Sequence, residues 1–427
     1  MHSFLDNTVV PEGGFIKVLP PCLFDVGLPT LDVCTDLSLI IPWYMQGHLI
    51  YAGAMTVPLM MQLLSSIFKW VKLEKSEDKI WSWIFVLLQL WPQLRALRWI
   101  RLVYKGDPKA LEKKNKMMAE IGTTEAFLEA WPSVIIMTCI FIHANQSGQG
   151  SLNTQAVFGD DSDYSPIKFL FTYLISVATA ALGVTKILQI GPCPILSDEG
   201  TLGGLLTWRF FINYMCVLCS LVSKGTFIAF MFVDSTYNNL MVETLSTLLL
   251  LFIPNILFSF FGILMSTGCN RKRFFSLVLG YPGLWLLSAA TFFSVGPKSI
   301  NCCSQNERGS EPHKLVISKV FTVLNMIVTV ISYVITFAVI YYIVESNNLP
   351  NYIKQNIIVG FTEFVVPLLT ISIIFAIISL LLDLNCCCAQ SQKCLCSCCC
   401  GPGCFKFKHQ HIYTDPETNA IEICKND

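Results

Sequence analysis

Two carboxylates stand four residues apart inside residues 117–143, an apolar stretch long enough to cross a lipid bilayer. This spacing places Glu125 and Glu129 on the same face of a helix, about one turn apart. Pro132 follows them and must weaken the helix, because proline has no amide hydrogen to donate. Charged side chains inside a membrane are costly and commonly mark transport paths or pairing sites. The stretch therefore predicts a polar site within a membrane.

Other apolar stretches also carry charges. Residues 21–45 contain three acids at offsets of 7 and 4, which places them on one helical stripe: Asp25, Asp32 and Asp36. Two later stretches carry Lys186 and Lys224. We expect these acids and bases to pair along a polar seam. Two interpretations stay open: the pairs only hold the helices together, or the seam is a hydrophilic track for an ion, a proton or a lipid headgroup.

The composition indicates the class of protein that contains this seam. Of 427 residues, 53% are hydrophobic and only 14% are charged, whereas an average soluble domain carries about 25% charged residues. This difference predicts a polytopic membrane protein. The formal net charge of zero argues against nucleic acid as a partner. The sequence contains no nucleotide-binding loop, HExxH motif or nucleophile elbow, so we do not expect an enzyme or a cofactor.

The expected fold class is an all-α membrane protein with about eight transmembrane helices and two re-entrant helices. The eight crossings are expected near residues 21–45, 48–71, 117–143, 166–190, 206–233, 241–267, 315–344 and 357–382. Residues 80–104 and 274–297 have interrupted apolar runs, which predict partly inserted helices; for 274–297 a full crossing is the alternative. A similar order of long and interrupted segments suggests two pseudo-symmetric halves, as in many transporters.

The domain boundaries follow from this order. They are a lead at 1–20, a first membrane half at 21–190, a linker at 191–205, a second half at 206–383 and a tail at 384–427. The loop lysines and arginines gather on the side that holds both termini, which predicts that this side is cytosolic. Asn145 opens a glycosylation sequon that then falls outside.

Ten of the 19 cysteines follow residue 385, just beyond the last apolar stretch. Juxtamembrane cytosolic cysteines are frequently palmitoylated, and the candidates are Cys386, Cys387, Cys388, Cys398, Cys399 and Cys400. A zinc site needs spaced ligand pairs, and these cysteines are crowded, so no metal ligand is predicted. The third alternative is a tail without modification.

Four segments resemble, in order, signature segments of the XK and XK-related membrane proteins. They are LDVCTD at 31–36, QLLSSIFKW at 62–70, LLQLWPQLRALR at 87–98 and EAFLEAWPS at 125–133. The resemblance is strongest over about residues 30–145. It implies a helical membrane fold in two halves and the scrambling of phospholipids, phosphatidylserine included, between leaflets without ATP.

The resemblance also implies a ladder of charged residues that passes lipid headgroups. It maps here to Asp32, Asp36, Glu125, Glu129, Lys186 and Lys224. Some relatives carry an acid three positions before this first lysine, where this chain has Gly183, so the ladder is expected to be shorter or shifted. The alternatives to a scramblase are a membrane adaptor that recruits a lipid-transfer or signalling partner, and a secondary transporter or channel.

The resemblance also suggests a location, a trigger and a partner. Relatives reside in the plasma membrane, which is the expectation here, with endomembranes as the alternative. Some relatives are activated by caspases, but neither tail contains a convincing Asp-x-x-Asp site. One relative is disulfide-linked to a single-pass partner. The loops expected outside contain no cysteine, so we expect no such bond, while a non-covalent single-pass partner remains open.

Overall fold

The computed structural model describes fifteen stretches of the chain. These are residues 19, 22–73, 79–104, 122, 125–147, 166–187, 208–238, 241–266, 270–280, 282–297, 315–346, 355, 358–390, 412–414 and 421–423. By contacts, the chain forms two compact units, Met1–Ser379 and Leu380–Asp427. The described helices belong to the first unit up to Ser379.

Within the described residues, six helices are long and apolar enough to cross a membrane. They are α3 (Leu49–Leu73), α9 (Pro166–Ile187), α11 (Trp208–Asn238), α12 (Met241–Ser266), α15 (Lys319–Ser346) and α17 (Val366–Gln390). Each coincides with a stretch in which the sequence predicts a crossing. The chain is therefore a multi-pass membrane protein.

Large apolar side chains cover the outer faces of these helices. In the most apolar part of α3, α12, α15 and α17, only 28–33% of the residues are buried inside the protein, against 72% in α11. Leu64, Phe68, Leu257 and Val334 are among the exposed side chains. In water such a surface would favour aggregation, whereas lipid tails solvate it. The contrast identifies α11 as the central helix of the unit.

The other two predicted crossings begin with π-helical turns. η2 (Cys22–Gly27) continues into α2 (Leu28–Met45), and η4 (Ala126–Ala130) continues into α7 (Trp131–Ser147). α2 is not among the six long apolar helices, and residues 126–142 form a shorter apolar helix. The total of eight crossings therefore stays a prediction.

The π-helical turns share a local cause. η7 (Gly360–Val365) leads into α17 as η2 and η4 lead into α2 and α7. In all three cases a proline, Pro29, Pro132 or Pro367, occupies the first or second position of the α-helix. The proline ring clashes with the carbonyl group four residues before it, and a π-turn widens the helix at that point.

Both interrupted segments form pairs of short helices. α4 (Lys79–Leu87) and α5 (Trp91–Tyr104) flank a turn in which Gln89 has a φ of 58°. Leu90 N donates to Phe85 O at 2.7 Å and Gln89 N donates to Val86 O at 3.0 Å, the pattern of a Schellman cap. α13 (Arg271–Gly280) and α14 (Pro282–Ala290) contain 10 and 9 residues. Since a crossing needs about 20 residues, residues 274–297 do not form one membrane-length helix.

Two antiparallel strand pairs complete the described elements. β1 (Val295–Pro297) pairs with β2 (Leu315–Ile317), with Gly296 opposite Val316. This pair joins the chain that leaves α14 to the start of α15. In the second unit, β3 (Ile412–Thr414) pairs with β4 (Ile421–Ile423).

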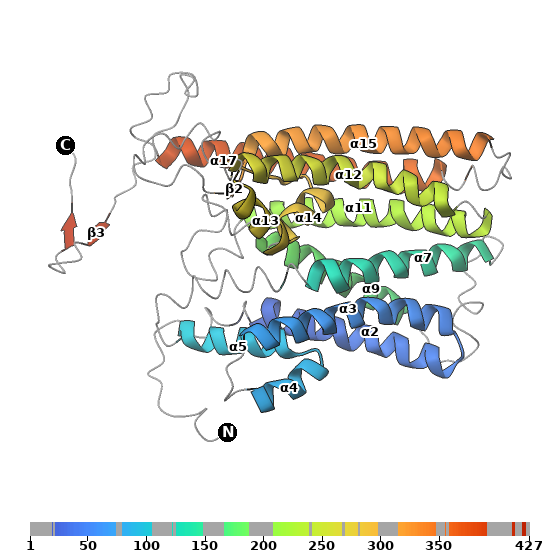
Figure 1. The fold of residues 1–427 in the computed structure, drawn as a ribbon, viewed down its shortest axis with the longest axis horizontal. Coiled ribbons are helices and arrows are strands. Elements are labelled where there is room, and N and C mark those ends of the chain that lie inside the picture. Colours follow the sequence, from blue (N-terminus) through green and yellow to red (C-terminus); the bar gives the residue numbers. More distant parts are fainter. Residues whose placement is uncertain are drawn as a thin grey trace. The chain divides into compact units, whose positions relative to one another are not determined.

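The long helices of the first unit lie side by side (Figure 1). α2 packs against α3 and α9, α11 packs against α7 and α9, and α12 packs against α15. The main hydrophobic core joins residues from both predicted halves, among them Ala126, Ala181, Val217, Leu287 and Tyr333. The two halves therefore share one core, and their pseudo-symmetry stays a prediction.

Candidate functional site

Four acidic side chains from two separate segments gather inside the first unit. α2 carries Asp32 and Asp36 one turn apart. η4 carries Glu129, and Glu125 is the residue directly before η4. α9 packs against both α2 and η4. Glu129 interacts electrostatically with the other three acids. The i to i+4 pairs that the sequence predicts on each helix thus meet in one cluster, which we call the carboxylate cluster.

The carboxylate cluster is buried. Asp32, Asp36 and Glu129 are 1%, 0% and 2% exposed, and Glu125 is 6% exposed. In a low-dielectric interior, negative charges this close repel one another strongly. The arrangement is therefore costly unless protons or a cationic group offset the charge.

Two serines donate hydrogen bonds to the cluster. Ser176 Oγ on α9 donates to Asp32 Oδ1 at 2.6 Å, and Ser133 Oγ on α7 donates to Asp36 Oδ2 at 3.1 Å. Neither serine is among the residues that the sequence predicts for the site. Ser133 lies four residues after Glu129, so helical spacing could have indicated it, whereas no local signal indicates Ser176.

Three carboxylate oxygens in the cluster keep free acceptor capacity. Asp32 Oδ2, Asp36 Oδ1 and Glu129 Oε1 are buried and accept no hydrogen bond from the part of the chain that the structure describes. Buried polar atoms in native proteins are nearly always hydrogen-bonded, so such exceptions require an explanation. No group of His, Cys, Asp and Glu residues within the described ranges has the arrangement of a metal site. The carboxylates of the cluster can take up protons and can accept hydrogen bonds from water or an organic cation.

Gly183 lets α9 approach η4. A Cβ atom at Gly183 would overlap the carbonyl oxygen of Gly122 and would lie 2.9 Å from Ala126 Cβ, closer than van der Waals contact allows. The acid that some XK-related proteins carry at this position would not fit here. A ladder of the kind that the resemblance implies could therefore have no acidic residue at position 183, because α9 packs closely against η4.

The two predicted lysines lie in different places. Lys186 is in α9, one turn after Gly183, and its side chain lies outside the described residues. Lys224 is completely buried in α11, and its Nζ donates to the carbonyl oxygen of Ala289 in α14. Its environment shows no electrostatic interaction with an acid of the described chain. The expected pairing with the carboxylates is thus not found at Lys224.

The predicted modification sites fall at the edges of the described residues. Asn145 lies in the last turn of α7, and Cys386, Cys387 and Cys388 lie in α17; the side chains of all four are outside the described part. Cys398, Cys399 and Cys400 lie outside it entirely. Glycosylation and palmitoylation therefore stay predictions.

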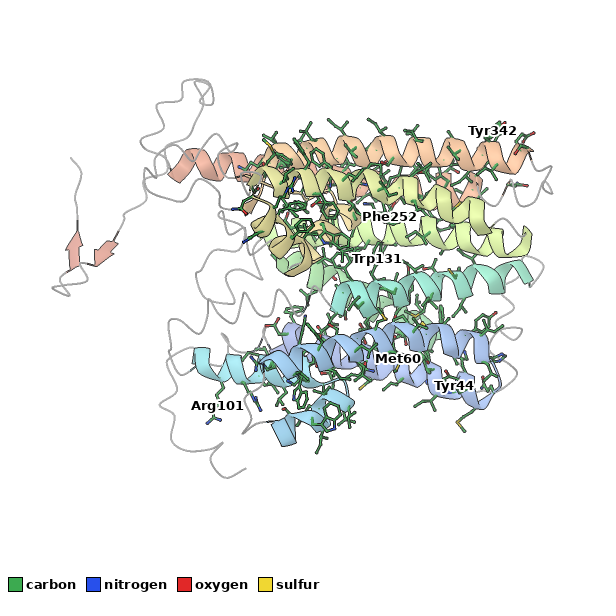
Figure 2. The ribbon with its side chains drawn as sticks, viewed as in Figure 1. Tyr44, Met60, Arg101, Trp131, Phe252 and Tyr342 are labelled. Atoms are coloured by element: carbon green, nitrogen blue, oxygen red, sulfur yellow. The ribbon has the colours of Figure 1, made fainter. Side chains whose placement is uncertain are left out.

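Trp131 connects the carboxylate cluster to the central helix. It follows Glu129 by two residues, and its Nε1 donates to Leu221 O of α11 at 3.1 Å. Its ring meets the edge of Phe252 of α12 with the centroids 6.3 Å apart (Figure 2). Gly225 of α11 lies beside this indole, and a Cβ atom there would make ordinary contact with it, 3.5 Å from Trp131 Nε1. The position of η4 is therefore fixed from the second half of the chain.

Removal of the Ser176 hydroxyl should destabilise the protein. Ser176→Ala leaves Asp32 Oδ1 without its donor, and a buried polar group that loses its partner costs about 1–3 kcal/mol. Thermal unfolding of the purified protein in detergent measures the effect. Ser332→Ala on α15 is the matched control. Within the described residues, that hydroxyl donates to Val328 O of its own helix, at 2.8 Å. Equal melting temperatures for the two variants would contradict the assigned contact.

These observations define a multi-pass helical membrane protein with a buried carboxylate cluster. Comparison with protein-family models, with curated proteins and with solved structures finds no match for this chain.

Proposed function

We propose that this protein is a phospholipid scramblase of the XK-related type. One observation carries the proposal. LDVCTD and EAFLEAWPS, two of the segments that resemble this family, are 97 residues apart at Asp36 and Ser133, which share a hydrogen bond. Together these segments supply all four acids of the carboxylate cluster. The segments that carry the resemblance are therefore the same segments that form the polar site.

The chemistry of the cluster suits a headgroup path. Phosphatidylcholine, phosphatidylethanolamine and phosphatidylserine all carry an ammonium group, which the free acceptor oxygens of Asp36 and Glu129 can attract. The exposed apolar side chains of the outer helices would meanwhile stay in contact with the lipid tails. Such movement runs down a gradient and needs no ATP. The acids are at most 6% exposed, so we propose that this conformation is closed and that headgroup passage requires α2 and α9 to separate.

The proposal includes a location and partners. We propose a plasma-membrane protein with both termini in the cytosol, with membrane phospholipids as its substrates. A single-pass partner would bind without a disulfide bond. The absence of enzymatic activity, of a cofactor and of a nucleic-acid partner stays a prediction of the sequence.

A second candidate function uses the same oxygens. A secondary transporter or channel could pass protons or cations along the carboxylate cluster, because carboxylates with unused acceptor capacity bind both. It differs from a scramblase in moving charge without moving lipid. The adaptor alternative has no supporting contact in the described residues.

A dithionite quench assay on purified full-length protein in liposomes tests the proposal. Dithionite bleaches only the fluorescent lipid in the outer leaflet, which is about half of the total. A scramblase brings inner-leaflet lipid to the outside, so more than about half of the fluorescence should be lost. Glu129→Gln should slow this loss by about tenfold, because a charge inside the membrane that serves a transport path is poorly replaced by a neutral group. Glu363→Gln is the matched control, since Glu363 also lies in a π-turn before a proline but is exposed. A plateau near half with folded protein would contradict a constitutively active scramblase, and proton and potassium flux into the same vesicles would then test the transporter.

A further inference from the structure

The end of the short helix α14 is buried in the protein interior. The residues there, Ser288 to Phe292, are at most 3% exposed. The last four carbonyl groups of a helix have no partner within that helix. Inside a membrane each such group needs a donor from elsewhere, because lipid tails supply none. The described chain provides these donors from two neighbouring helices.

Five consecutive carbonyl groups at this end lie within hydrogen-bond distance of donors on side chains of α11 and α15. On α11, Lys224 Nζ donates to Ala289 O, and Ser220 Oγ donates to Ala290 O at 2.9 Å. On α15, Asn325 Nδ2 lies within hydrogen-bond distance of Ser288 O, Thr291 O and Phe292 O, at 3.2, 3.3 and 3.1 Å. We call Ser220, Lys224 and Asn325 the α14 cap.

The charge of Lys224 suits this location. The carbonyl end of a helix carries a partial negative charge of about half an electron, which favours a cation. Lys224 and Ser220 are four residues apart on α11, so they face α14 together. A protonated amine at this position is stabilised by the helix dipole, and the Ala289 carbonyl group accepts its hydrogen bond inside the protein.

The α14 cap is part of a larger polar network. Thr329, one turn after Asn325 on α15, donates to Asn255 Oδ1 of α12 at 3.0 Å. Ser294 N, just beyond α14, donates to Thr322 Oγ1 of α15 at 3.3 Å. Side-chain hydrogen bonds thus hold the end of α14 to α11 and α15, and α14 also packs against α12. On α11, the next residue after Ser220 is Leu221, whose carbonyl group accepts the Trp131 indole.

We propose that Lys224 is a positioning residue that fixes the partly inserted helix α14 against the central helix, and that it makes no contact with a lipid headgroup. This assignment differs from the role that the resemblance implies, and it does not depend on the proposed function. Because one turn of α11 receives both α14 and Trp131, the α14 cap also sets where the start of α7, directly after η4, lies against α11.

Hydrogen–deuterium exchange of the full-length protein in nanodiscs tests this role. Lys224→Met should accelerate exchange of peptides covering 282–297 by about tenfold, since the cation that opposes the helix dipole is lost. Lys224→Arg, which keeps the charge and the donors, should stay closer to the natural protein than Lys224→Met. Exchange of α3, which is remote from the cap, should not change. Ser223→Ala is the matched control, because this neighbour of Lys224 contacts Tyr333 and Val365 O instead of α14.

The results that would overturn the assignment are specific. Unchanged exchange of 282–297 in Lys224→Met, or an equal acceleration over the whole chain, would remove the positioning role. If Lys224→Met does not fold, Ser220→Ala and Asn325→Leu replace it. Ser220→Ala should accelerate exchange of the same peptides by about threefold, as expected for one lost hydrogen bond. Asn325→Leu should accelerate it at least as much, because Asn325 Nδ2 contacts three carbonyl groups. If both variants exchange peptides 282–297 at the rate of the unsubstituted protein, that result would contradict the α14 cap. If Lys224→Met changes the relative rates at which the protein moves anionic and zwitterionic lipids, Lys224 contacts headgroups and the assignment is wrong.

Discussion

Neutralising two acids of the carboxylate cluster, as Asp36→Asn with Glu129→Gln, is expected to abolish lipid movement while making the protein more resistant to heat. The side-chain amide oxygen that Asp36→Asn introduces can still accept the hydrogen bond that Ser133 donates to Asp36 at 3.1 Å. The two substitutions together remove the negative charge that Asp36 and Glu129 can carry beside Asp32 and Glu125. The free energy of unfolding should therefore rise, within the range of up to about 4 kcal/mol that is known for buried ion pairs replaced by uncharged residues of similar volume.

The opposite signs of the two effects make this prediction decisive. Residues kept for function are often placed at the expense of stability, whereas residues that hold helices together should lose stability when changed. Melting temperature in detergent and dithionite quenching in liposomes, measured on the same preparation, give both quantities. Glu363→Gln, at an exposed glutamate, should change neither. If the doubly substituted protein is less stable but moves lipid as fast as the unsubstituted protein, the cluster only holds the helices together.

Replacing Gly183 with a larger residue is expected to destabilise the protein strongly. Gly183→Leu should lower the free energy of unfolding by about 3 kcal/mol or more, the upper range for overpacking in a closely packed core. Even its Cβ atom would overlap the backbone oxygen of Gly122, and backbone cannot rotate away as a flexible side chain can. The displaced segment is the one that carries Glu125 and Glu129, so lipid movement should be lost as well.

Gly53→Leu is the control for this substitution. Gly53 lies in α3, and a Cβ atom there has no neighbour within 4 Å. A leucine in a helix is favoured over glycine by roughly 0.5–1 kcal/mol, so this variant should melt at or slightly above the natural temperature. Heating followed by size-exclusion chromatography compares the two. Gly183→Asp, which introduces the acid of the XK-related proteins, should fail as Gly183→Leu does. A stable Gly183→Asp would mean that α9 and η4 can separate at little cost.

The sequence by itself determined the class of the protein and the location of its long helices. A run of about 20 apolar residues without charge has one stable solution in a bilayer, because only a helix satisfies all of its own backbone groups there. Six predicted crossings therefore coincide with long helices. The same local logic predicted the interruptions near residues 80–104 and 274–297, where short helices occur. It also placed Asp32 with Asp36, and Glu125 with Glu129, since neighbours four apart share a helical face.

Only the tertiary structure decided how these pieces meet. Ser176 reaches Asp32 across 144 residues and Ser133 reaches Asp36 across 97, and no local pattern encodes either partner. A buried cation such as Lys224 is expected opposite the acids, but its side chain faces the carbonyl end of α14. This partly negative site consists of backbone carbonyl groups, so the residue types in the sequence do not indicate it. Gly183 shows the same limit, since its need to be small comes from the backbone of Gly122 on another segment. Helix formation depends on nearby residues, whereas the choice of partner depends on which helix faces come into contact, and that is set by the packing of the whole bundle.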